Sequence, residues 1–198
     1  MRLSSQRWRG ALFAAALAAS NAAADPSAFP ANLLAAATTQ VGVTVSYDPA
    51  YVRIAYPGGD VPLDRGVCTD VVIRAYRALG IDLQQRVHED MREAWSAYPK
   101  LWGLRAPDRN IDHRRVPNLA TFFGRHGATL RVSQTDASQY APGDIVTWRL
   151  ASGVPHIGLV SATRQAGRPL IVHNFGAGTQ IEDVLFAYTV TGHYRYEP

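Results

Sequence analysis

The chain has 198 residues, with 20 basic and 16 acidic side chains and a formal charge of +4 at pH 7. Three arginines lie within the first nine residues, so a chain that begins after residue 24 keeps 17 basic and 16 acidic side chains, a net charge of +1. So small a charge argues against a nucleic-acid-binding protein. No later stretch is long and apolar enough for a membrane span.

The N-terminus has the pattern of a secretory signal peptide. Arg2, Arg7 and Arg9 precede a short apolar run at 11–19, and alanines at 22–24 form a small-residue cleavage site. We therefore expect residues 1–24 to be removed and residues 25–198 to form one domain, exported to a bacterial periplasm as a monomer. Roughly 170 residues are enough to bury a core.

The first half of this domain is predicted to be mainly helical. Apolar residues spaced i, i+3, i+4 indicate helices, and alternation indicates strands. In chain order we expect a helix over 29–40, strands over 41–47 and 51–56, helices over 68–79 and 88–97, an ordered loop over 99–117 and a helix over 119–125.

The last third is predicted to be a sheet. Short apolar runs separated by Gly- and Pro-containing turns indicate strands over 145–148, 157–160, 170–172, 188–190 and 193–196. Their close spacing favours an antiparallel meander. Helices followed by a sheet make an α+β domain.

Cys68 is the only cysteine and lies in the first turn of the predicted helix over 68–79. One cysteine cannot form an internal disulfide, so it is either a buried, inert thiol, a link to another chain or a reactive group. Free N–H groups and the positive end of the helix dipole favour a thiolate at this position. Cys68 is therefore a candidate nucleophile.

A cysteine nucleophile needs an imidazole base and a polar group that orients it. His156 begins one predicted strand and His173 ends the next, so antiparallel pairing would bring them together. His156 is the expected base, and His173 or Asn174 would fix its tautomer. The other histidines, at positions 88, 126 and 193, are interpreted as structural.

The remaining polar candidates allow two interpretations each. Asp70 either caps the helix or bonds the arginine-rich loop, and its position favours the cap. Asp112, His113 and Arg114 either bind substrate carboxylates or belong to a salt-bridged loop. A zinc set that includes Cys68 and His113 lacks the usual ligand spacing, so we expect no metal and no cofactor.

The order of these motifs resembles the NlpC-type cell-wall peptidases of the papain-like superfamily. The motifs are Cys68 at a helix start, Pro-Gly-Asp at 142–144, His156 before a Gly-containing strand, and His173 on the next strand. The resemblance implies a papain-like fold with N-terminal helices and a C-terminal antiparallel sheet. It also implies a thiol hydrolase with a Cys68–His156–His173 triad that cleaves amide bonds in peptidoglycan stem peptides.

Three longer stretches, at 64–70, 110–118 and 191–196, resemble the YijF-like exported bacterial proteins, a domain of unknown function (DUF1287). This resemblance implies a fold more than an activity. A non-catalytic cell-envelope binding or scaffold protein of the same fold is therefore the alternative to a hydrolase.

Overall fold

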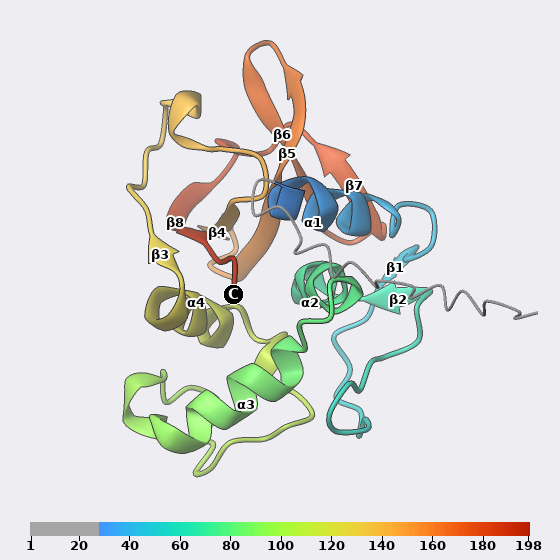
Figure 1. Cartoon of the computed structure of the whole chain (residues 1–198), viewed down its shortest axis with the longest axis vertical. Coiled ribbons are helices and arrows are strands. Elements are labelled where there is room, and N and C mark those ends of the chain that lie inside the picture. Colours follow the sequence, from blue (N-terminus) through green and yellow to red (C-terminus); the bar gives the residue numbers. More distant parts are fainter. Residues whose placement is uncertain (1–27) are drawn as a thin grey trace, which may run out of the picture.

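The helix that carries Cys68 lies at the centre of the fold. A computed structural model describes residues 28–198, so the predicted signal peptide lies outside the described residues. Helix α2 (Cys68–Ala78) packs against α1 (Phe29–Thr38) and against the sheet. Figure 1 shows α2 near the middle of the view, with the sheet above it and to its left, α4 (Val116–His126) to its left and α3 (Leu83–Glu93) below.

The sheet confirms the predicted α+β class. Six antiparallel strands pair in the order β3-β8-β4-β5-β6-β7, and β1 (Ser46–Tyr47) and β2 (Arg65–Gly66) form a separate parallel pair. Strands β4 to β6 form the predicted meander and β7 extends it, whereas β8, expected to continue the meander, returns to lie between β3 and β4. The strands of the large sheet are β3 (Ala128–Thr129), β4 (Ile145–Arg149), β5 (Pro155–Gln165), β6 (Arg168–Asn174), β7 (Thr179–Glu182) and β8 (Thr189–Arg195).

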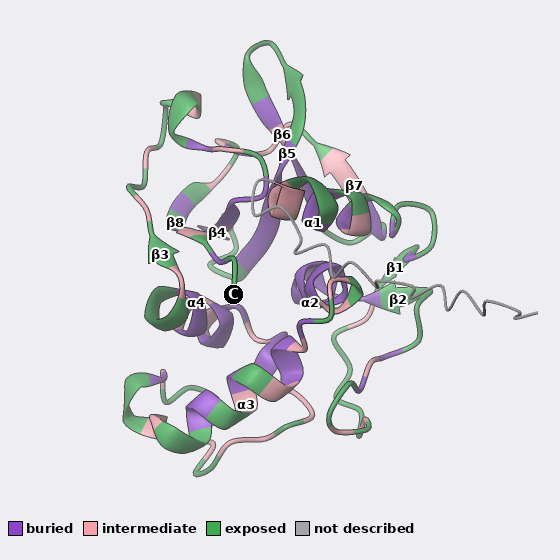
Figure 2. Ribbon diagram, in the orientation of Figure 1, coloured by how far each residue is buried: buried purple, intermediate pink, exposed green. Residues whose placement is uncertain are grey.

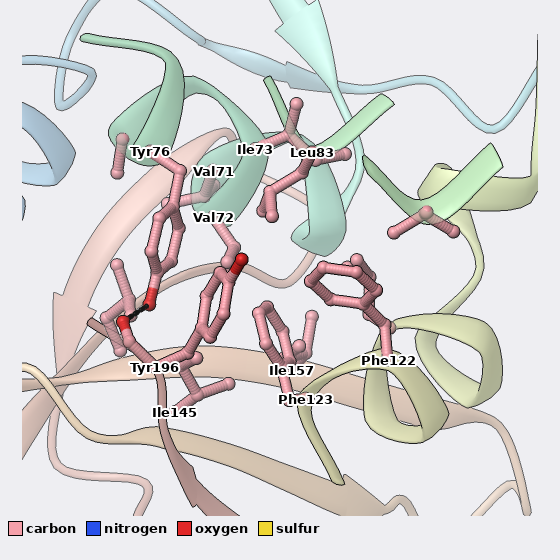
Figure 3. Close-up of a cluster of buried hydrophobic side chains, with 14 of the residues drawn as sticks. Val71, Val72, Ile73, Tyr76, Leu83, Phe122, Phe123, Ile145, Ile157 and Tyr196 are labelled. Atoms are coloured by element: carbon pink, nitrogen blue, oxygen red, sulfur yellow. Dashed lines mark hydrogen bonds between the residues drawn. The ribbon is translucent and has the colours of Figure 1, made fainter. Parts of the chain in front are cut away.

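One apolar core joins the helices to one face of the sheet. Ile157 and Val172 from the sheet pack with Val72 of α2 and with Phe122 and Phe123 of α4. Figure 3 shows this cluster, with the Tyr76 hydroxyl bonded to the Tyr196 carbonyl oxygen at 2.7 Å. A second cluster around Trp148 and Ile171 covers the other face of the sheet.

Helix α2 is buried on nearly all sides, including the face opposite its apolar residues, where Arg74 lies. Every residue from Cys68 to Tyr76 is buried (Figure 2). Arg74 is only 8% exposed because it bonds Asp60 and the carbonyl oxygens of residues 61, 62 and 65. It thereby holds the loop that leads into the helix.

Several predicted elements differ from the structure. The strand expected over 41–47 shortens to β1, because residues 39–43 form turns. The strand expected over 51–56 is irregular chain, because no neighbouring strand pairs with it and the Ile54 amide bonds the Asn110 side chain instead. The helix expected over 88–97 begins at Leu83, where Asp82 accepts hydrogen bonds from two helix amides. The two strands expected after residue 187 form one strand, β8, and β7 was not predicted. Within residues 28–198 no helix is long and apolar enough to cross a membrane.

Candidate active site

Cys68 lies at the N-terminus of α2, where its thiol meets the start of β5. The Tyr47 hydroxyl and the Ile157 backbone N–H both lie near Sγ, close enough to affect the pKa of the thiol. Cys68 is 4% exposed. Burial raises the pKa of the thiol to about 12, although the amides of Ile157, Thr69 and Cys68 itself act to lower it. The helix terminus does favour a thiolate, as predicted, but desolvation of the buried thiol opposes it more strongly.

The thiol lines a pocket of about 390 Å³ that opens between α2, the loop over 99–117 and the start of β5. Aromatic side chains surround it, since Tyr47, Tyr51 and Trp102 all contribute. Trp102 has a left-handed backbone (φ 61°), and the guanidinium of Arg115 lies over its ring at 4.2 Å. The other lining residues are Pro49, Val67, Ile111, Arg114, Val116, Pro117, Val154 and Pro155.

A buried ion pair holds the start of α2 in place. Arg114 donates to both carboxylate oxygens of Asp70, at 2.9 Å each, and the two side chains are 2% and 3% exposed. Asp70 also accepts the Val67 amide at 2.7 Å, which is the predicted cap. Arg114 reaches the carbonyl oxygens of Asp48 and Ala50 as well. The pair therefore fixes the Cys68 turn against two loops that line the pocket.

The structure brings the two predicted imidazoles into contact. His156 Nε2 lies 2.9 Å from His173 Nδ1, and both residues are buried. Burial lowers the pKa of both imidazoles, that of His156 to about 3, so the pair is neutral at pH 7. The ring of Phe175 shields both, with its centroid 5.4 Å from that of His156.

Cys68 lies next to the backbone of β5 beside His156, and not next to the imidazoles themselves. The amide that meets Sγ belongs to Ile157, the residue directly after His156. Side chains of successive strand residues point to opposite faces, and Ile157 packs in the core beside α2. Within residues 28–198 the structure forms no hydrogen bond between Sγ and an imidazole.

The other residues expected to bind or orient substrate are buried and hold loops. Asn174 donates to the carbonyl oxygens of Ser46 and Gly66, which ties β6 to the turn before Cys68. Asp112 accepts from Arg115, and burial raises the pKa of Asp112 to about 6. His113 is 2% exposed, and burial, followed by the Arg114 charge, lowers its pKa to about 3. The described residues contain no cluster of three or more side chains suited to hold a metal ion.

Two residues of the site were not predicted from the sequence. Tyr47 ends the short strand β1, and no motif connects it to Cys68, 21 positions away. Glu182 lies on the unpredicted strand β7, and its Oε2 is 3.0 Å from His173 Nε2. A strand prediction over 179–182 would have placed Glu182 beside β6.

This arrangement, an α+β domain with a helix-terminal cysteine beside a histidine pair, belongs to a described family. The family model described as "Domain of unknown function (DUF1287)" matches residues 34–196, so the chain is a member of this family. It is similar to the "Uncharacterized protein YijF" of Escherichia coli (strain K12), with 57% identity over 161 residues, 81% of this chain and 78% of that protein.

Proposed function

We propose that this protein is an exported cysteine amidohydrolase that cleaves amide bonds in the stem peptides of peptidoglycan. The observation that carries the proposal is that three features lie together. Cys68 lines a pocket at the N-terminus of α2, and the backbone amide of Ile157 lies at its thiol. The residue before Ile157 is His156, whose imidazole contacts that of His173. The fold that the proposal implies is papain-like, and the protein acts as a monomer in the periplasm.

The proposed reaction starts from a neutral thiol and a neutral imidazole. His156 takes the Cys68 proton as the sulfur attacks the amide carbonyl, and the amide N–H at the start of α2 stabilises the oxyanion. The tetrahedral intermediate collapses, the C–N bond breaks, and His156 donates its proton to the leaving amine. Water then attacks the thioester with His156 as base, which releases the acid and restores the thiol. Because the His156 imidazole and the Cys68 thiol lie on opposite faces of β5, this step requires the start of β5 to turn the imidazole towards Sγ, and that movement is part of the proposal.

The shape of the pocket supports an extended substrate. A second hollow of about 640 Å³ shares Val116, Pro117 and Pro155 with the Cys68 pocket, so the two form one groove. Apolar side chains and Arg149 line this groove, while Arg114 and Arg115 at its Cys68 end are paired with Asp70 and Asp112. An apolar groove with one guanidinium at its side suits a peptide that carries a carboxylate.

The test is turnover of purified peptidoglycan and its soluble muropeptides, read by mass spectrometry of the products. The wild-type protein should release a new amine and a new carboxylate at one bond, and Cys68→Ala should release none. His126→Ala is the control, because His126 lies on α4 and bonds Asp90, outside the groove. Cleavage that persists in Cys68→Ala would exclude Cys68 as the nucleophile.

One observation favours a non-catalytic envelope-binding protein instead. The thiol is buried and its pKa is raised to about 12, which is typical of an inert cysteine. Co-sedimentation with peptidoglycan separates the two functions. A binding protein would sediment with the polymer without cleaving it, and Cys68→Ala would bind as well as the wild type.

A further inference from the structure

A carboxylate on β7 touches the far side of the histidine pair. Glu182 Oε2 lies 3.0 Å from His173 Nε2, and the Glu182 side chain is 48% exposed whereas that of His173 is 1% exposed. The approach is oblique to the N–H direction, and Nε2 has no hydrogen-bond partner within residues 28–198. Because half of Glu182 is in solvent, its carboxylate can turn into line with Nε2.

The sheet register explains how Glu182 reaches this position. His173 pairs with Gln180 across β6 and β7, and Glu182 is two residues further along β7. Residues two apart on a strand point to the same face, so Glu182 is a diagonal neighbour of His173. His156 points to this face as well, because it pairs with Trp148, whose ring centroid lies 5.9 Å from its own.

These contacts determine which ring nitrogen of each histidine carries the hydrogen. A carboxylate only accepts, so Glu182 requires the N–H of His173 on Nε2. His173 Nδ1 is then a bare acceptor, and the His156 nitrogen 2.9 Å away, Nε2, must carry its N–H. This leaves the free lone pair of His156 on Nδ1, the nitrogen not used in the pair.

We propose that Glu182 is a positioning residue that sets the tautomers of both imidazoles and so makes His156 Nδ1 the base. That His156 acts as a base rests on the proposed function, whereas the assignment of the two tautomers does not depend on it. The charged groups that act on the pair support the assignment. The charge of His173 on β6 acts on His156, and the charge of Glu182 on β7 acts on His173. The negative charge of Glu182 favours the protonated form of the His173 imidazole. Glu182 therefore also stabilises the positive charge that His156 gains when it takes a proton.

The direct test reads the tautomers by NMR in protein labelled with ¹⁵N-histidine. At pH 7 the wild type should show an Nε2–H tautomer for both His156 and His173. Glu182→Ala should give a mixture of tautomers at His173. Glu182→Gln should restore the Nε2–H tautomer, because its amide oxygen can still accept. Unchanged tautomers in Glu182→Ala would overturn the proposal, whether or not the protein has an activity.

The control is the neighbouring carboxylate, Asp183, which pairs with Arg168 and not with a histidine. Asp183→Asn should leave both tautomers and turnover unchanged. With a cleavable substrate, Glu182→Ala should lower kcat about tenfold at an unchanged KM, a modest loss because solvent screens a half-exposed carboxylate. Tautomers that respond to Glu182 in a protein without hydrolase activity would support the positioning role and refute the hydrolase. A kcat that is equal in Glu182→Ala and the wild type would refute a role of the tautomers in catalysis.

Discussion

The burial of Cys68 leads to a quantitative prediction for its reactivity with iodoacetamide. A thiol with a pKa of about 12 is ionised at pH 7 to roughly 1 part in 10⁵, against roughly 3% for an ordinary thiol of pKa about 8.5. That is a loss of about 3,000-fold in thiolate. A more basic thiolate is intrinsically a better nucleophile, by about 25- to 60-fold over this pKa difference. The native protein should therefore react roughly a hundredfold more slowly than an ordinary cysteine.

The chain provides its own reference, because Cys68 is the only cysteine. The same protein unfolded in urea gives the ordinary rate, and mass spectrometry follows both reactions without interference from another thiol. The native rate should rise about tenfold per pH unit from pH 7 to pH 10 with no plateau. His156→Ala should leave this curve unchanged, since a neutral imidazole does not shift the thiol. A plateau with a midpoint below pH 8 that disappears in His156→Ala would refute the reasoning from burial and indicate a thiolate–imidazolium pair.

Three further predictions concern stability. Arg114→Ala leaves the Asp70 charge buried without its partner and should lower the free energy of unfolding, measured in urea, by about 3–5 kcal/mol. Arg168→Ala removes an exposed ion pair and should lower it by under about 1 kcal/mol. Equal losses in the two variants would contradict the difference in burial. Folded His113 and His156 resist protonation because their pKa values are lowered to about 3, while the unfolded chain takes up both protons near pH 6.5. Each histidine should therefore lower the stability by up to about 1.4 kcal/mol per pH unit as the pH drops from 6.5 towards 4.5, and Asp112, whose folded pKa is raised to about 6, should offset part of this loss below pH 6. His113→Asn should make the slope less steep by up to about 1.4 kcal/mol per pH unit, and an unchanged slope would contradict the burial of a neutral His113. Gly158→Ala would place a Cβ 2.6 Å from Ile171 Cγ2 and 3.1 Å from His173 Cβ. We therefore expect the free energy of unfolding to fall by about 1–3 kcal/mol and the His173 NMR signal to change. An unchanged signal would mean that the backbone shifts away from His173 to make room for the Cβ.

The sequence predicted those parts of the fold whose local pattern agrees with their surroundings. Helix α2 and strands β4 to β6 have strong periodicity, and the position of histidines on consecutive strands was enough to predict the contact between His156 and His173. The strand expected over 51–56 alternates equally well and is nonetheless irregular. Alternation of apolar and polar residues describes only the side chains. A strand also needs a neighbouring strand to which its backbone can hydrogen-bond, and residues 51–56 have none among the described residues.

The rest depends on contacts between distant residues. Strand β7 has the sequence Thr-Gln-Ile-Glu, which is too polar to predict, and it forms because β6 offers it hydrogen bonds. The pKa of Cys68 follows from how deeply the first turn of α2 is covered, which a sequence does not report. The same holds for Arg74, which lies opposite the apolar face of α2 and is nonetheless buried and bonded to Asp60.

The position of Tyr196 has a consequence for how the chain reaches its fold. This residue, third from the end, packs against Tyr76, Phe122 and Phe123 in the centre of the helical core, and β8 just before it lies inside the sheet (Figure 3). During synthesis, therefore, neither the core nor the sheet can close until Tyr196 has left the ribosome. The pairing of β8 with β4, across 40 to 49 residues, adds to the delay. Until then the apolar faces of the helices and of β4 stay uncovered, and a protease or a chaperone can bind them.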